Sequence, residues 1–348
     1  MLTILSGLGI GLAMGFVMQR GRFCMAGGIR DTFLQKDFTM VIAILIAISI
    51  QSLGLFAFYE LGWVKLPTGH FPWLATLIGG VLFGLGMAAA GSCSTGAYYR
   101  AAEGLAASVM AVLGFIVASK LVRTAELKSM LAPIKQQQLA DQTLYQSLGV
   151  SPWLVSIALA LLTSVVAMRY LKRRKRPVAL MTPRRSGLAH LLFEARWHPF
   201  VSALIIGVLA LLALLAWPAS LESGRVGGVG ISGPSAQLWD LLTTGNTKFF
   251  GWPGYFLIGL FVGAFIAARG SSEQRWRYPG HKTVLFGLIG GLLMGFGSGI
   301  AGGCMLGNAL VGTAYLSWQG WLFIPAILLG SYCFSYFTLI RPMRLAQI

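Results

Sequence analysis

Nine long apolar stretches dominate the sequence and leave few folds open to it. They lie near residues 2–19, 38–60, 73–91, 104–122, 151–171, 199–217, 252–268, 283–301 and 319–340. A helix of roughly 20 apolar residues crosses a bilayer core about 30 Å thick. Charged residues make up only 11% of the chain, against about 25% in a soluble domain. We therefore predict an all-α integral membrane protein with about nine transmembrane helices in a lipid bilayer. The composition argues against a soluble enzyme or a nucleic-acid binder.

Three further apolar stretches, near 94–102, 235–244 and 305–315, are too short to cross a bilayer. Backbone of this kind is tolerated at membrane depth only when protein surrounds it. We predict that they form re-entrant half-helices. Residues 1–19 lack the basic start and the small-residue cleavage pattern of a signal peptide, so we expect them to be a retained first span.

Basic residues between the spans predict the orientation. The loop at 172–198 holds eight Lys and Arg residues against one acidic residue, Glu194, and the positive-inside rule places it in the cytoplasm. Counting nine spans from this loop puts the N-terminus outside and the C-terminus inside. The loop at 123–150 then lies outside, where we expect a polar connection without a site.

An internal repeat ends on a cysteine in both copies. Residues 77–96 align without gaps to 288–307 with eleven of twenty positions identical, Cys93 matching Cys304. Because the predicted topology runs these two spans in opposite directions, we predict inverted repeats about a pseudo-twofold axis. A first repeat at 1–122 and a second at 199–348 would flank a connecting region at 123–198.

A weaker copy of this pattern occurs twice more. Residues 11–27 bring Cys24 into the register of Cys93. The same glycine register in 259–272 places Ser272 in the fourth position. The repeat therefore predicts three cysteines and one serine at equivalent places, with Cys333 outside the pattern.

The glycines of the repeat predict two roles. Small residues four positions apart allow helices to pack closely, and we expect this for Gly80, Gly84, Gly291 and Gly295. Glycines beside the cysteines instead predict helix breaks that expose backbone N–H groups. The candidates are Gly91, Gly96, Gly302, Gly303 and Gly307.

The cysteines are the candidate site, with Cys93 and Cys304 as the central thiols and Cys24 as the third. No C-x-x-C pair or Cys/His cluster of metal-ligand spacing occurs, so neither a metal nor a cofactor is predicted. A thiol in apolar surroundings stays neutral and presents a weak donor and a polarizable surface. Helix N-termini add partial positive charge. This combination suits a soft, sulfur-bearing anion, which Arg100 is placed to attract.

Two other interpretations stay open. The cysteines could be small packing residues, which is what we expect of Cys333. They could also belong to a membrane thiol redox or sulfurtransferase enzyme, although such a nucleophile needs a neighbouring His or Lys. Four methionines near the cysteines either extend a sulfur-rich lining or fill space: Met25, Met87, Met294 and Met305.

Five segments together resemble the YeeE/YedE family of sulfur transport proteins, most closely its thiosulfate-uptake permeases. They are GFVMQRGRFC at 15–24, AAAGSCSTGAYYRAAEG at 88–104, RWHPF at 196–200, AGGCMLGNALVG at 301–312 and SWQGW at 317–321. The resemblance covers nearly the whole chain.

This resemblance implies an hourglass-shaped permease of the bacterial inner membrane, with its N-terminus in the periplasm. It implies that thiosulfate passes Cys24, Cys93 and Cys304 through transient S–H···S contacts, without enzymatic chemistry or a cofactor. A small cytoplasmic sulfur carrier of the TusA-like (YeeD-like) kind is the implied partner. A different sulfur- or selenium-containing anion remains an alternative substrate.

Overall fold

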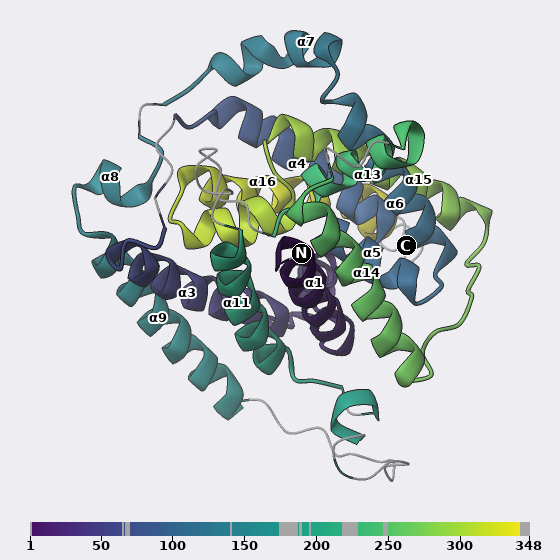
Figure 1. The fold of residues 1–348 in the computed structure, drawn as a ribbon, viewed down its shortest axis with the longest axis horizontal. Helices are drawn as coiled ribbons and strands as arrows, with labels where there is room; N and C mark the ends of the chain where they lie inside the picture. Colours follow the sequence, from purple (N-terminus) through teal and green to yellow (C-terminus); the bar gives the residue numbers. More distant parts are fainter. Residues whose placement is uncertain are drawn as a thin grey trace.

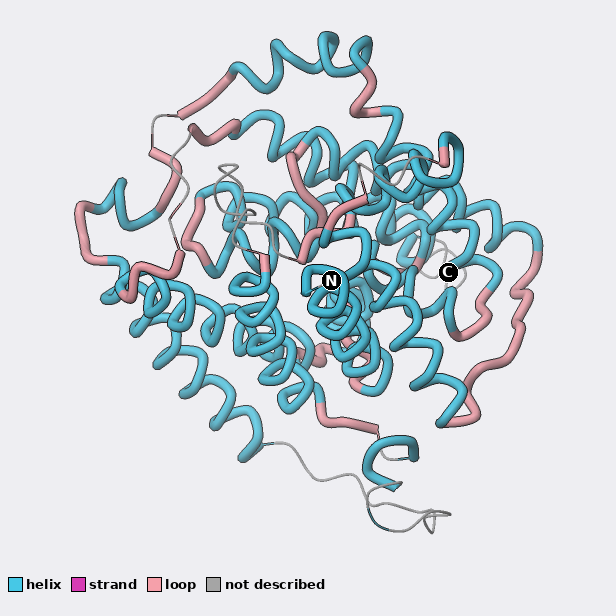
Figure 2. The backbone as a smooth tube through the Cα atoms, viewed as in Figure 1, coloured by secondary structure: helices cyan, strands magenta, loops and turns pink. Residues whose placement is uncertain are grey.

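The computed structural model describes residues 2–64, 66, 70–139, 141–173, 187, 190–194, 196–217, 229–245 and 250–341. Within these ranges every named element is a helix (Figure 1, Figure 2). Eight helices are long and apolar enough to cross a membrane, and a bent pair gives a ninth if it is one span. The prediction of an all-α, multi-span membrane protein is confirmed.

The predicted apolar stretches each coincide with a helix. The long helices are α1 (Leu2–Arg20), α3 (Thr39–Glu60), α4 (Trp73–Ala90), α6 (Ala106–Leu121), α9 (Pro152–Arg173), α11 (Pro199–Ala216), α14 (Trp252–Gly270), α15 (His281–Ile300) and α16 (Trp318–Ser335). The shorter ones are α2 (Met25–Gln35), α5 (Ser94–Ala102), α7 (Ala125–Gln136), α8 (Leu144–Leu148), η1 (His190–Glu194), α13 (Ser232–Thr244), η3 (Met305–Gly312) and η4 (Tyr336–Ile340). The bent pair is α6 and α7, which meet at 79°.

Glycine faces let the long helices pack closely, as predicted for four of these glycines. A Cβ atom at Gly80 or Gly84 would collide with α16, and one at Gly291 or Gly295 would collide with α6. Helices α4 and α15 lie antiparallel, since Gly79 faces Gly297 and Ala301 while a site further along, Gly86, faces Gly290. Helix α1 packs against α14 at similarly close range.

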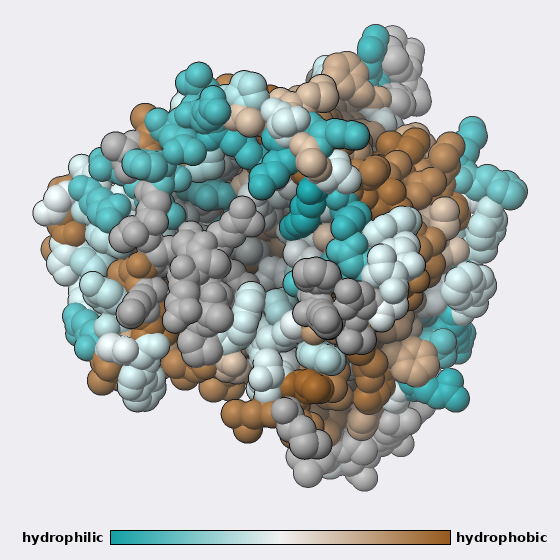
Figure 3. Space-filling view, turned by 45° about the horizontal axis from the view of Figure 1, so that its top comes forward, coloured by the Kyte–Doolittle hydropathy of each residue, from teal (hydrophilic) through white to brown (hydrophobic). Residues whose placement is uncertain are grey.

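The outer surface is apolar over much of its area. Helix α9 lies at the edge of the bundle (Figure 1) and exposes Leu154, Leu161 and Leu162. Hydrophobic residues form broad areas of the face in Figure 3, and hydrophilic residues gather at its top. Soluble monomers rarely expose apolar area on this scale, so the surface fits a lipid-facing bundle.

Part of the orientation prediction lies outside the described residues. In the basic loop, positions 174–186 lie outside the described residues. The C-terminal positions 342–348 do as well. The orientation and the boundaries at 122 and 198 therefore stay predictions.

Candidate functional site

Each of the three repeat cysteines directly precedes a short helix. Cys24 is the N-cap of α2, Cys93 of α5 and Cys304 of η3, and all three have extended backbone conformations. The exposed fractions of the three residues are 2%, 3% and 0%. Three buried thiols therefore lie at helix starts, where backbone N–H groups are unpaired by the helix. The glycines predicted such breaks near Cys93 and Cys304, but Gly96 and Gly307 lie inside α5 and η3 and not at the breaks.

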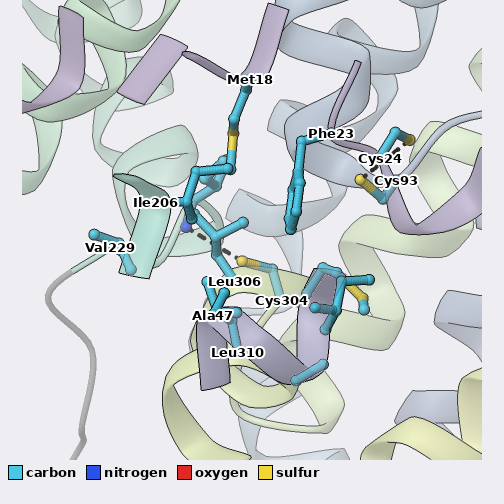
Figure 4. Packing of buried hydrophobic residues seen from close by; sticks show 14 of the residues in the cluster. Met18, Phe23, Cys24, Ala47, Cys93, Ile206, Val229, Cys304, Leu306 and Leu310 are labelled. Carbon is cyan, nitrogen blue, oxygen red and sulfur yellow. Dashed lines mark hydrogen bonds between the residues drawn. The ribbon is translucent and has the colours of Figure 1, made fainter. Parts of the chain in front are cut away.

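Cys24 and Cys93 are in contact. Their Sγ atoms lie 3.6 Å apart (Figure 4), within hydrogen-bonding range for sulfur. Gly96 makes room for this pair, since a Cβ there would lie 2.7 Å from the Cys24 sulfur. The Gly96 N–H also donates to Cys93 Sγ at 3.3 Å. The structure thus places Cys93 in contact with Cys24, whereas the repeat predicted Cys93 and Cys304 as the central thiols.

Cys304 lies on the other side of Phe23 from this pair in Figure 4. Its Sγ accepts a hydrogen bond from the backbone N–H of Ile231 at 3.2 Å. Ile231 is the N-cap of α13, so a fourth short helix begins beside the third cysteine.

The prediction that Ser272 holds the fourth position is wrong. Helix α14 ends at Gly270, Ser272 has a φ of 58° and the next helix begins at His281. The fourth short helix in the cysteine cluster is α13, which begins after Ile231. Helices α1 and α14 have similar glycine spacing because they pack against each other through it: Gly15 meets Leu260, and Gly263 meets Leu12.

The helix breaks at two of the cysteines need glycine. Gly91 ends α4 with a φ of 64°, and Gly302 follows α15 with a φ of 78°. This left-handed region strains any residue with a Cβ. Arg100 stabilises the turn at Gly91, because its Nη1 donates to the Gly91 carbonyl at 2.8 Å.

An asparagine stabilises the turn at Gly302. Asn308 Nδ2 donates to the carbonyls of Ala301 and Gly303, both at 3.2 Å. Gly303 is needed here as well, since a Cβ on it would lie 2.5 Å from Asn308 Oδ1. Asn308 was not among the predicted site residues, although an amide four residues after Cys304 in an apolar segment was a visible signal.

A large basic cavity reaches Cys24. This Cys24 cavity has a volume of about 1130 Å³. Five arginines line it, against Asp31 and Asp37: Arg20, Arg22, Arg30, Arg100 and Arg196. Arg100, which we predicted to attract an anion, lines this cavity together with Cys24.

A second cavity, of about 500 Å³, reaches Cys304. Gly302 and Gly303 line this Cys304 cavity, together with Arg123 and Lys135. None of its described lining residues is acidic. The connection at 123–150, which we predicted to carry no site, contributes Arg123 and Lys135 to this lining. Two of its cations line a cavity that ends on a thiol.

A small apolar cavity, of about 20 Å³, lies at Cys93. Its lining includes Phe23 and Met25, which flank Cys24, as well as Met305 and Leu306, which follow Cys304. The cavity therefore connects the surroundings of the Cys24–Cys93 pair to those of Cys304. Two of the four methionines noted in the sequence thus line this Cys93 cavity. Met87 and Met294 are buried in the packing of α4 and α15.

A buried ion network lies behind the Cys24 cavity. Glu103, 2% exposed, accepts two hydrogen bonds from Arg22 Nη1 at 2.7 and 2.9 Å. Arg22 also pairs with Glu273 at 2.9 Å. Burial alone would raise the pKa of Glu273, but Arg22, a hydrogen bond from Gln19 and Arg20 hold that pKa below its ordinary value. The network ties the segment before Cys24 to the ends of α5 and α14.

Comparison with known proteins identifies the family. The model of the sulphur transport family matches residues 20–333. The chain belongs to this family. It is 45% identical over 345 residues to the thiosulfate transporter TsuA of Escherichia coli K12, covering 99% of this chain and 97% of the relative.

Other members are more distant. The thiosulfate transporter TsuA of Spirochaeta thermophila is 27% identical over 347 residues, covering 96% of this chain and 98% of the relative. The probable transporter YedE of E. coli K12 is 31% identical over 112 residues, 32% of this chain and 27% of the relative. These relatives are named as transporters, in agreement with the prediction of a transporter rather than an enzyme.

Proposed function

We propose that this member of the sulphur transport family is a permease of the bacterial inner membrane that takes up thiosulfate. The observation that supports it is the order of cavities and thiols. A cavity ending on Cys304 and a cavity ending on Cys24 are separated by the small apolar cavity at Cys93. The anion would pass the three thiols in the order Cys304, Cys93, Cys24.

Direction follows from the proposed orientation, with the N-terminus in the periplasm and the C-terminus in the cytoplasm. The Cys304 cavity contains Arg123 and Lys135 from the connection at 123–150, so it would open to the periplasm. The Cys24 cavity lies at the far end of α1 and would open to the cytoplasm. Both entrances carry cations, and the centre between them is apolar.

We propose transient hydrogen bonding as the means of passage. Neutral thiols donate weakly, and a soft sulfur accepts without becoming trapped. A fixed cation at the centre would hold a dianion too strongly to release it. No covalent step is needed, and no cofactor takes part.

The proposed architecture is an hourglass of two inverted repeats, 1–122 and 199–348, linked by 123–198. It is supported by the antiparallel contact of α4 with α15 and by the four short helices α2, α5, α13 and η3 at the cysteine cluster. These would be the re-entrant half-helices. A pseudo-twofold axis would exchange α4 with α15 and η3 with α5.

Uptake of a dianion works against a negative-inside potential by about 2 × 2.3 kcal/mol per 100 mV. Rapid consumption inside would offset this cost. We propose that a TusA-like cytoplasmic carrier receives the sulfur at the mouth of the Cys24 cavity, where the arginines gather.

Growth tests the proposal. The gene is expressed in a bacterial strain that lacks sulfate and thiosulfate uptake, with thiosulfate as sole sulfur source. We expect the wild type and Cys333→Ser to support growth and Cys93→Ser and Cys304→Ser to fail at equal expression. Cys333 is a matched control because it is a half-buried thiol on α16, outside the repeat pattern. Normal growth of both Cys93→Ser and Cys304→Ser, or a stable persulfide on Cys93, would contradict the proposal.

A further inference from the structure

Three buried hydroxyl side chains surround Cys93 in the sequence. Ser92, Ser94 and Thr95 are 0%, 1% and 1% exposed. None of the three hydroxyl oxygens has a hydrogen-bond partner within the described part of the chain. A buried hydroxyl without a partner loses its hydrogen bonds to water and gains none in return. Ser92 precedes α5, and Ser94 and Thr95 are its first two residues, so no carbonyl of this helix lies one turn back to accept from their hydroxyls.

Thr95 differs from the other two by its position. It lines the Cys93 cavity, together with Cys93, Phe23, Met25 and Met305. Of the other five lining residues, four are aliphatic and the fifth is Met18, so Thr95 is the one oxygen-bearing side chain among the ten. Among these ten lining residues, only Thr95 carries a side-chain group that forms strong hydrogen bonds with oxygen.

Thiosulfate has two chemically different ends. Its terminal sulfur is soft and suits thiols and thioethers, and one thiol and three thioethers line this cavity. Its sulfonate oxygens are hard acceptors and lose water as the anion enters a space of about 20 Å³. A hydroxyl rotates freely and donates one O–H group. A bond from it to a charged acceptor is stronger than one to a neutral acceptor.

We propose that Thr95 is a specificity-determining residue for the oxyanion end of the substrate. Its hydroxyl donates to a sulfonate oxygen while the terminal sulfur faces Cys93 and the neighbouring thioethers. A volume of about 20 Å³ has room for roughly one water molecule, so the cavity has to widen as the anion passes, and it then contacts both ends of the anion at once. This inference rests on the proposed thiosulfate transport.

Valine provides the sharpest test, because it replaces the hydroxyl by a methyl group of similar size. Labelled thiosulfate uptake into proteoliposomes is compared for the wild type, Thr95→Val, Thr95→Ser and Ser94→Ala. Ser94→Ala is the matched control, since it removes a buried, unpartnered hydroxyl from the preceding residue, which is not among those lining the cavity. We expect Thr95→Val to lower uptake roughly tenfold, as loss of one hydrogen bond to a charged group predicts. Thr95→Ser and Ser94→Ala should stay within about twofold of the wild type.

A stability measurement separates this role from a structural one. Because Thr95→Val removes an unpartnered hydroxyl, its thermal midpoint in detergent should equal or exceed that of the wild type. Wild-type uptake by Thr95→Val, equal losses in Thr95→Val and Thr95→Ser, or an equal loss in Ser94→Ala would overturn the inference. Absence of uptake by the wild type would instead contradict the proposed function.

Discussion

The Sγ atoms of Cys24 and Cys93 lie 3.6 Å apart, although 69 positions separate the two residues in the chain. The contact depends on two helix breaks, one after α1 and one after α4, whose short helices start at the same point in the bundle. Gly96 completes it by leaving space for the Cys24 sulfur.

Mild oxidation should therefore join Cys24 to Cys93. The sulfurs need to approach from 3.6 Å to about 2.05 Å. Diamide would take two electrons from the pair and release two protons as the bond forms. Mass spectrometry of the digested protein should find the Cys24–Cys93 peptide pair and leave Cys304 reduced. Uptake should fall on oxidation and return with dithiothreitol. A Cys93–Cys304 link as the main product would show that the thiols are arranged differently.

The turns at Gly91 and Gly302 should not tolerate alanine. Both have positive φ angles, 64° and 78°, where a Cβ costs about 1–2 kcal/mol. Gly62 is a matched control, since its φ is 72° and a Cβ there meets no atom within 4 Å. All three alanine variants should lower the thermal midpoint in detergent. Only Gly91→Ala and Gly302→Ala should also lower thiosulfate uptake, so equal uptake losses in all three would contradict a role for these turns in the pathway.

The Arg22–Glu103 pair should show strong coupling. Arg22→Met removes the Nη1 group that donates to both Glu103 oxygens and leaves this carboxylate, 2% exposed, with Arg277 at 3.4 Å and Gln19 at 3.3 Å. The change should cost up to about 3 kcal/mol of stability. Adding Glu103→Gln removes the buried charge and should recover much of the loss. A double-mutant cycle on unfolding in detergent measures this coupling. Additive effects of the two substitutions would mean that the pair contributes little.

Acidification should weaken the same network through Glu273. Its pKa is lowered in the folded protein: burial alone would raise it, and Arg22, Gln19 and Arg20 outweigh that effect. The stabilisation is therefore present at neutral pH and lost as the pH falls through the folded-state pKa. The midpoint difference between wild type and Glu273→Gln should be largest near pH 7 and shrink in acid. A difference that grows on acidification would have the wrong sign.

Much of the architecture could be predicted from local sequence. The length of each apolar stretch predicts a helix without knowledge of its neighbours, and Gly91 and Gly302 stand out because they interrupt such stretches beside a cysteine. The packing glycines were equally visible, since their spacing is a property of one helix face.

The pairing of groups from different helices could not be predicted in this way. The glycines of α1 and α14 suggested that Ser272 matches Cys24, but that likeness arises from the contact between the two helices. The placement of Arg123 and Lys135 beside the Cys304 cavity depends on how the chain folds back after α6. Neither relation leaves a local signal.

Uptake of labelled thiosulfate by the purified protein in proteoliposomes tests passage along the cysteines most directly. We expect saturable uptake by the wild type and by Cys333→Ser. We expect at least a tenfold lower rate for each of Cys24→Ser, Cys93→Ser and Cys304→Ser, because a hydroxyl is a harder, less polarizable group than a thiol. Wild-type rates in all three variants, at equal amounts of folded protein, would contradict passage of thiosulfate along these cysteines.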